Sequence, residues 1–260
     1  MSGNPTAVGT VKYELHEDIA FVTLDAPPLN ILTAAVMADL TASVEFALTE
    51  PTARALVLRA EGRAFSAGAD VAEHRPEQAP DMIAAFGRLF DVLAGSELPI
   101  VAAVEGAALG AGFELAMMAD ILIATDRATF GQPEIRLGFF APLAVAWLGR
   151  RLGIGRAIEI TALGRTYSAA EMHEFGLVSQ VVPADALHAA LDAVLGDLRR
   201  TSAAVMRMNV RLVRASLDRP FAEARHAAER VFLDELMATE DVREGIAAFY
   251  GKRRPAWQHC

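Results

Sequence analysis

Short aliphatic runs alternate with amphipathic helical patterns along the first half of the chain, and this alternation limits the possible folds more than any other feature. The runs at Ile19–Leu24 and at residues 55–58 are bounded by Pro27-Pro28 and Gly62, as is typical of buried strands. Between them, apolar residues recur at helical spacing after Thr33, a residue type that caps helix N-termini. The pattern predicts an α/β fold with strand, helix and strand in succession.

The same alternation continues and then gives way to helices. An amphipathic helix is predicted over residues 82–93, with strands at Ile100–Val104 and at residues 121–124. Strand signals become sparse after Gly155, and helical patterns dominate from Val205 onward. We therefore predict two parts: an α/β core of residues 1–195 and a C-terminal helical region of residues 196–260.

Composition and charge exclude several classes of partner. Hydrophobic residues make up 53% of the chain and charged residues 22%, which predicts a folded, globular chain. The formal net charge of −9 argues against a nucleic-acid partner, because such a partner requires a basic face. The apolar stretch over residues 98–124 is interrupted by Glu105, Glu114 and Asp120, which argues against a membrane span. The uncharged run over residues 137–149 is too short to span a bilayer and is expected to be core.

The compartment is predicted from the cysteine content and the first residues. The single cysteine, Cys260, allows no intrachain disulfide, which favours a reducing compartment. Residues 1–9 lack the charged and apolar blocks of a signal peptide. We predict a cytoplasmic protein.

Three short segments carry the candidate chemistry, and the first two are turns of small residues. Residues 64–70 follow the second predicted strand, and their small side chains would let backbone amides reach an oxygen atom; the alternative is an ordinary tight turn. Residues 106–116 form a turn that enters a helix and places Glu114 among apolar neighbours. The alternative for Glu114 is a solvated glutamate that complements the helix dipole.

The third segment, residues 128–138, carries a second glutamate in a restrained setting. Pro133 holds the chain extended and fixes how Glu134 is presented. The alternative is a surface salt bridge between Glu134 and Arg136. Two carboxylates in such surroundings, where pKa values are readily perturbed, favour acid/base catalysis and therefore an enzyme.

Other catalytic classes lack their motifs. A G-x-G-x-x-G dinucleotide loop fails because Leu115 stands at the third glycine position, and no G-x-S-x-G serine elbow occurs. The histidines show no metal-ligand spacing, so no metal site is predicted; they are His16, His74, His173, His188, His226 and His259.

Taken together, in this order and at these separations, the three segments resemble the enoyl-CoA hydratase/isomerase (crotonase) superfamily. The similarity extends through residues 175–178 to residues 240–249 and covers nearly the whole chain. It implies a crotonase-like spiral of ββα units over residues 1–195 and a helical trimerisation region over residues 196–260. It also implies a homotrimer, or a hexamer that is a dimer of trimers.

The resemblance also implies roles for single residues. The backbone amides of Ala69 and Ala111 would form an oxyanion hole for a thioester carbonyl, with Glu114 and Glu134 as the acid/base pair. Contacts to the acyl group or to coenzyme A are implied for Ala67, Gly68, Asp70, Gly110, Phe113, Phe139, Phe140, Phe249 and Lys252. For Lys252 the alternative is a solvated basic tail. Coenzyme A is then part of the substrate, and no separate cofactor is implied.

The paired glutamates favour an enoyl-CoA hydratase that adds water across the conjugated double bond of an acyl-CoA thioester, as in fatty acid metabolism. Residues 139–147 depart from the pattern of straight-chain hydratases and are similar to the hydratases of cyclic dienoyl-CoA esters. A cyclic dienoyl-CoA hydratase, an enoyl-CoA isomerase and a hydrolase of β-oxo rings therefore stay open as alternatives. A non-catalytic acyl-CoA-binding protein is a further one.

Overall fold

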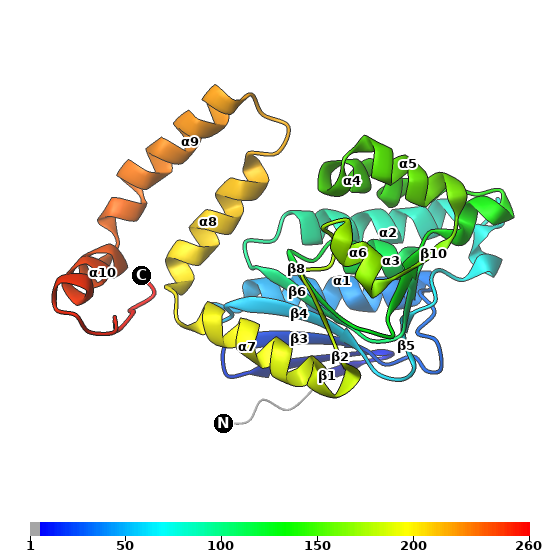
Figure 1. The fold of residues 1–260 in the computed structure, drawn as a ribbon, viewed down its shortest axis with the longest axis horizontal. Helices are drawn as coiled ribbons and strands as arrows, with labels where there is room; N and C mark the ends of the chain where they lie inside the picture. The colour runs from blue at the N-terminus through cyan, green and yellow to red at the C-terminus, as the bar shows by residue number, and fades with distance from the viewer. Residues whose placement is uncertain (1–5) are drawn as a thin grey trace.

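The computed structural model describes residues 6–260 and contains two β-sheets with helices around them (Figure 1). The seven-stranded sheet has, in spatial order, β1 (Thr6–Val8), β2 (Val11–His16), β3 (Ile19–Leu24), β4 (Ala55–Ala60), β6 (Ile100–Val104), β8 (Ile121–Thr125) and β11 (Gln180–Val182). The four-stranded sheet has β10 (Thr166–Ser168), β9 (Thr129–Gly131), β7 (Ala107–Leu109) and β5 (Ala64–Ser66).

The helices follow the strands in chain order. The α-helices are α1 (Ala34–Thr49), α2 (Ala79–Ala94), α3 (Ala111–Met117), α4 (Pro142–Leu152), α5 (Ile154–Leu163), α6 (Ala169–Glu174), α7 (Leu187–Arg199), α8 (Ala203–Ala215), α9 (Phe221–Asp234) and α10 (Glu240–Tyr250). The 3₁₀-helices are η1 (Val71–His74), η2 (Pro133–Leu137), η3 (Ala184–Ala186) and η4 (Leu236–Ala238). Within residues 6–260, no helix combines the length and the apolar character needed to cross a membrane.

A ββα unit repeats through the core. Each of the strands β4, β6 and β8 lies in the seven-stranded sheet, and the next strand, β5, β7 or β9, lies in the four-stranded sheet. A helix follows each pair: α2 after β5, α3 after β7 and α4 after β9. The predicted α/β fold with a spiral of ββα units is confirmed by this order, since the strands advance by one position in both sheets with each unit.

Both faces of the parallel part of the seven-stranded sheet are largely buried. Strands β3, β4, β6, β8 and β11 run parallel, and parallel sheets are normally covered on both sides. Along β4, Leu56 and Leu58 face the main core with α1 and α2, whereas Ala55 and Val57 face α7. This alternation explains why the strands read as uninterrupted aliphatic runs in the sequence.

Most sequence-based elements agree with the structure. The strand Ile19–Leu24 is confirmed, and Thr33 is the N-cap of α1, where its hydroxyl accepts a hydrogen bond from the Val36 amide at 3.2 Å. The expectation that residues 137–149 are core is confirmed only in part. Ala144 and Leu148 of α4 belong to the core, whereas Phe140, which lies between η2 and α4, is 68% exposed.

The C-terminal region is helical, as predicted, and Figure 1 shows α8, α9 and α10 set apart from the sheets and joined to them through α7. The predicted division after residue 195 falls inside α7. Leu187, Leu191 and Leu195 of this helix pack on the sheet, so α7 belongs to the core by its contacts. The chain changes direction at residues 200–202, between α7 and α8.

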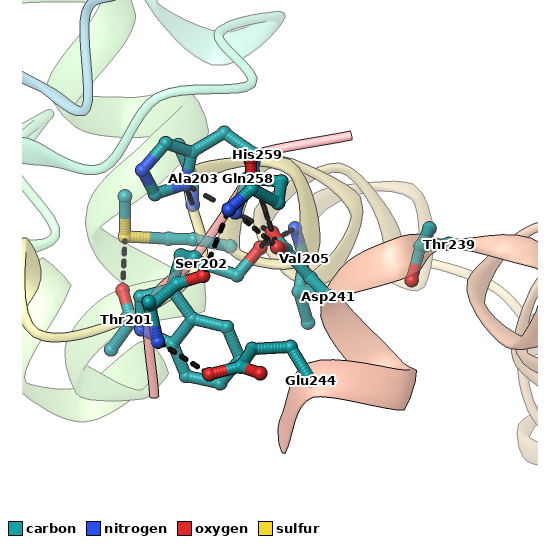
Figure 2. Close-up of polar contacts among 12 residues, drawn as sticks. Thr201, Ser202, Ala203, Val205, Thr239, Asp241, Glu244, Gln258 and His259 are labelled. Carbon is teal, nitrogen blue, oxygen red and sulfur yellow. Dashed lines mark hydrogen bonds and ion pairs between the residues drawn. The ribbon is translucent and has the colours of Figure 1, made fainter. Parts of the chain in front are cut away.

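A buried carboxylate joins the start of α8 to the end of the chain. Figure 2 shows Asp241, which is 1% exposed, between Ser202 and the backbone of Gln258 and His259. Its carboxylate accepts hydrogen bonds from the Ser202 hydroxyl, from the Gln258 amide at 2.6 Å and from the His259 amide at 3.0 Å. The last residues of the chain are therefore tied to the N-termini of α8 and α10.

We expect Asp241→Asn to destabilise this junction, because one acceptor oxygen becomes a donor among groups that are themselves donors. Leaving one such buried group unpaired costs about 2 kcal/mol in the free energy of unfolding. Urea denaturation measures the loss, with Glu240→Gln as the control, since Glu240 is the exposed neighbour on the same helix and should change stability by less than about 0.5 kcal/mol. Equal stability of the two variants would contradict this role of Asp241.

Candidate active site

The backbone amide of Ala69 points away from Leu32, with which Ala69 forms an isolated parallel β-bridge. Leu32 donates a hydrogen bond to the Gly68 carbonyl at 2.9 Å and accepts one from the Asp70 amide at 3.2 Å. In an extended chain successive amides point in opposite directions, so the Ala69 N–H faces the other side. Within residues 6–260 it has no hydrogen-bond acceptor, and Ala69 lines a cavity on that side.

The amide of Ala111 is also unpaired. Ala111 is the first residue of α3, where N–H groups have no partner within the helix, and none is provided by another part of residues 6–260. The preceding Gly110 has φ 53° and ψ −125°, a conformation that glycine adopts readily and other residues adopt rarely. A Cβ on Gly68 would lie 3.7 Å from the Ala111 nitrogen, so the two turns touch and their unpaired amides are neighbours.

Glu114 is buried beneath these amides, one turn into α3. It is 4% exposed, and its Oε1 accepts a hydrogen bond from the Ala144 amide, in the first turn of α4, at 2.8 Å. Burial raises the pKa of Glu114 to about 7, an effect that Glu134 reinforces and the Ala144 hydrogen bond opposes. A carboxyl group with such a pKa can both take up and release a proton near neutrality.

Glu134 is half-buried at the start of η2, directly after Pro133. The Gln132 side-chain amide, with its nitrogen facing Glu134, donates to Oε2 at 2.8 Å and to Oε1 at 3.2 Å. Burial raises the pKa of Glu134, whereas the hydrogen bond from its own backbone amide and the charge of His74 lower it. A Cβ on Gly110 would lie only 2.2 Å from Glu134 Oε1, so this carboxyl packs against the glycine turn.

These groups surround an apolar cavity of about 250 Å³. Its walls come from α2, α3, η2 and α4; the lining residues include Ala69, His74, Met82, Ile83, Phe86, Gly87, Phe90, Asp91, Ala111, Glu114, Glu134, Phe140, Pro142, Leu143 and Ala146. A second cavity of about 120 Å³ adjoins it, and Ala69, His74 and Glu134 line both. One carboxyl group and one unpaired amide thus lie where the two cavities meet.

The structure brings most of the predicted site residues together. Ala69, Ala111, Glu114, Glu134 and Phe140 line the larger cavity, and Ala67, Gly68, Gly110 and Phe139 line the smaller one. Asp70 lies beside them, where its carboxylate caps η1 by accepting a hydrogen bond from the Ala72 amide at 2.9 Å.

Three predicted residues lie elsewhere. Phe113 is fully buried against Phe130, with ring centroids 5.9 Å apart, and lines neither cavity. Phe249 is 79% exposed near the end of α10, and Lys252 follows it, so neither contacts the cavities of its own chain. The sequence did not predict His74 or the cavity wall formed by α2. The apolar residues of α2 recur at helical spacing, and this spacing is equally compatible with packing in the core.

The arrangement can carry out chemistry on a carbonyl compound. Two neighbouring N–H groups can stabilise negative charge that develops on a carbonyl oxygen, and the two carboxyl groups can move protons in an apolar cavity. Within residues 6–260, no three His, Cys, Asp or Glu side chains are grouped as they would be around a metal ion.

We expect Gly110→Ala to lower activity by at least about 100-fold, because the new Cβ would displace the Glu134 carboxyl group and strain the turn that carries the Ala111 amide. Steady-state kinetics on the purified variant measures the loss. The matched control is Gly149→Ala in α4, where a Cβ meets no atom within 4 Å and full activity is expected. An active Gly110→Ala variant would show that this close contact is dispensable.

Comparison with known proteins gives consistent matches over the whole chain. The family model of enoyl-CoA hydratase/isomerase matches residues 14–259. A probable enoyl-CoA hydratase of Mycobacterium bovis is 38% identical over 253 residues, which is 96% of this chain and 98% of that protein. The cyclohexa-1,5-dienecarbonyl-CoA hydratase of Thauera aromatica is also 38% identical, over 91% of each chain.

A solved structure agrees with these matches. The enoyl-CoA hydratase of Mycobacterium smegmatis superposes with a TM-score of 0.90 at 29% sequence identity, over 96% of this chain and 99% of that one. The similarity therefore includes the C-terminal helices as well as the two sheets.

Proposed function

Because this chain belongs to the enoyl-CoA hydratase/isomerase family, we propose that it is an enoyl-CoA hydratase, which adds water across the conjugated double bond of an acyl-CoA thioester. The observation that carries the proposal is the pairing of a buried and a half-buried carboxyl group with two unpaired amides around one apolar cavity. Coenzyme A enters as part of the substrate, and the chemistry needs no further cofactor.

In the proposed mechanism the thioester carbonyl accepts hydrogen bonds from the amides of Ala69 and Ala111. Glu114 takes a proton from a water molecule as that water attacks the β-carbon, and negative charge moves onto the carbonyl oxygen. Glu134, at the junction of the cavities, supplies the α-proton. The acyl group occupies the larger cavity, and the pantetheine arm leaves through the smaller one, past Gly68 and Phe139.

A cyclic dienoyl-CoA ester is the second candidate substrate. Three aromatic side chains, Phe86, Phe90 and Phe140, line the larger cavity, and flat rings suit such walls. The 38% identity to a cyclohexa-1,5-dienecarbonyl-CoA hydratase supports the same choice. The reaction is unchanged, since water again adds to a double bond conjugated with the thioester.

We further propose that the chain acts as a homotrimer or a dimer of trimers in the cytoplasm. Large apolar side chains are exposed on the C-terminal helices; they are Val213, Phe221, Phe232, Leu233, Phe249 and Tyr250. Burying them against further copies would remove apolar surface from water, which stabilises an oligomer. Such contacts would bring Phe249 and Lys252 to a neighbouring subunit, where they would contact the coenzyme A bound to that subunit.

The test is to mix the purified protein with crotonyl-CoA and follow the absorbance of the conjugated thioester, with product mass as confirmation. Loss of absorbance with a gain of one water in mass supports a hydratase. A product of unchanged mass supports an isomerase instead. If crotonyl-CoA does not react, cyclohexa-1,5-dienecarbonyl-CoA is the next substrate, and binding of both without turnover would overturn the proposal in favour of an acyl-CoA-binding protein.

A further inference from the structure

Helix α4 forms part of the cavity wall but has few fully buried side chains of its own. The residues of α4 that line the larger cavity are Pro142, Leu143 and Ala146. Of the 11 residues in this helix, only Ala144 and Leu148 are buried. Polar contacts therefore contribute to how α4 is held against the rest of the chain.

Hydrogen bonds near both ends of α4 join this helix to α3. In the first turn of α4, the Ala144 amide donates to Glu114 Oε1 at 2.8 Å. In its last turn, Arg151 Nη1 donates to the carbonyl oxygens of Met117 at 3.0 Å and of Ala119 at 2.8 Å. The helix that supplies the hydrogen bond to Glu114 is thus fixed at its other end by one arginine side chain.

The two carbonyl groups that Arg151 contacts depend on it. Met117 is the last residue of α3 and Ala119 lies just beyond it, and both residues are buried. The last carbonyls of a helix have no partner within that helix, and no backbone amide of residues 6–260 donates to either of these two. Because a buried carbonyl without a partner is costly, Arg151 is held firmly at this position.

The hydrogen bond from α4 acts on Glu114 directly. The Ala144 amide lowers the pKa of Glu114, whereas burial and the charge of Glu134 raise it, and no charge effect of Arg151 acts on it. The titratable side chains that line the larger cavity with Glu114 are His74, Asp91 and Glu134. Asp120 is the charged group that acts on Arg151, which stays protonated at any pH at which the protein is folded. A pKa of Glu114 that changes when Arg151 is replaced therefore reports the Ala144 contact.

We propose that Arg151 is a positioning residue for Glu114: by fixing the last turn of α4 to the end of α3, it holds the first turn of α4 where the Ala144 amide meets the Glu114 carboxyl group. The inference rests on the proposed function, in which Glu114 takes a proton from water. Release of the far end of α4 would weaken this hydrogen bond and shift the cavity wall. Arg151 would then act through α4, without contact to the substrate.

Substitutions in the last turn of α4 separate the donor from the rest of the side chain. Arg151→Met keeps a long unbranched side chain and removes every donor. Arg151→Lys keeps the charge and a donor on a shorter side chain. Because both hydrogen bonds come from the single atom Nη1, one ammonium group can restore part of the contact. The matched control is Arg150→Met, since Arg150 is exposed on the same turn and pairs with Asp218.

The titration of Glu114 tests this connection without turnover. It can be followed by NMR on protein labelled with ¹³C at the glutamate carboxyl carbons, with Glu114→Gln to assign the signal. We expect the pKa of Glu114 to lie above its wild-type value in Arg151→Met and between the two in Arg151→Lys, because a weaker Ala144 hydrogen bond opposes burial less. Arg150→Met should match the wild type. An unchanged titration in folded Arg151→Met would overturn the proposal, and if this variant does not fold, an unchanged titration in Arg151→Lys would do the same.

Kinetics with crotonyl-CoA adds a readout that a merely structural role would not move. In Arg151→Met we expect kcat to fall about 10- to 100-fold, as for other small displacements of a catalytic group, with partial recovery in Arg151→Lys. The acidic limb of the pH–rate profile should move to higher pH, because Glu114 must be ionised to take a proton from water. Lower activity with an unmoved acidic limb would contradict the positioning role. If the wild type hydrates no enoyl-CoA, the proposed function fails, whereas the NMR titration still decides whether Arg151 positions Glu114.

Discussion

Glu134→Gln is expected to lower turnover about 1,000-fold while thioester binding stays near normal. The amide has the size of the carboxyl group and no ionisable proton, and general acid–base catalysis by one group contributes about 10²- to 10⁴-fold. The apolar walls and the amides of Ala69 and Ala111, which would supply most of the binding, are unchanged. The loss should therefore appear in kcat, and KM should change little.

Three measurements define this result. Stopped-flow or steady-state kinetics gives kcat, calorimetry with a non-reactive acyl-CoA gives the dissociation constant, and α-proton exchange shows whether the lost step is the proton transfer. Glu105→Gln is the matched control, since Glu105 is an exposed glutamate between β6 and β7. Full activity in Glu134→Gln would remove this residue from the mechanism and leave Glu114 as the sole acid/base group.

The parts of the site that the sequence predicted are those that depend on local backbone geometry. Gly68 and Gly110 both have positive φ, at 106° and 53°, and both sit in turns where a Cβ would collide with a neighbouring segment. Such positions call for glycine whatever the rest of the chain does. The residue types alone therefore indicated that backbone amides in these two turns could reach an oxygen atom, whereas the choice of the Ala69 and Ala111 amides came from the family resemblance.

The parts that were missed depend on the direction of a side chain within its helix or on contacts between distant segments. Phe113 follows the glycine turn directly, but it points into the core because the helix rotates by about 100° with each residue, whereas the next residue, Glu114, faces the cavity. His74 was unremarkable in sequence, since its neighbours Glu134 and Phe139 lie some sixty residues away and meet it only in the folded chain.

The exposed apolar residues of α4 and of the C-terminal helices have a related explanation. Hydrophobicity predicts that a side chain is removed from water, but it does not say whether the partner is the chain's own core, a ligand or another copy. Phe140 illustrates this, because it is 68% exposed and yet lines the larger cavity. The expectation that residues 137–149 were core assumed only the first of these partners.

Glu114→Gln is expected to be nearly inactive and, at alkaline pH, more stable than the wild type. In the folded chain burial raises the pKa of Glu114 to about 7, compared with 4.5 for an exposed glutamate. A raised folded-state pKa gives stability that is complete below about pH 4.5 and is lost as the pH rises through about 7. Between these limits the cost of ionising the buried carboxyl group grows to about 3 kcal/mol.

Glutamine removes this pH-dependent cost, because it cannot ionise and its carbonyl can still accept the hydrogen bond from the Ala144 amide. The difference in unfolding free energy between Glu114→Gln and the wild type should therefore rise by up to about 3 kcal/mol from pH 4.5 to pH 8. Urea denaturation at both pH values measures it, with Glu105→Gln as the control that should show no such change. A difference that stays constant with pH would mean that Glu114 is ionised in the folded protein throughout this range. Its proposed role in taking a proton from water near neutrality would then lack its physical basis.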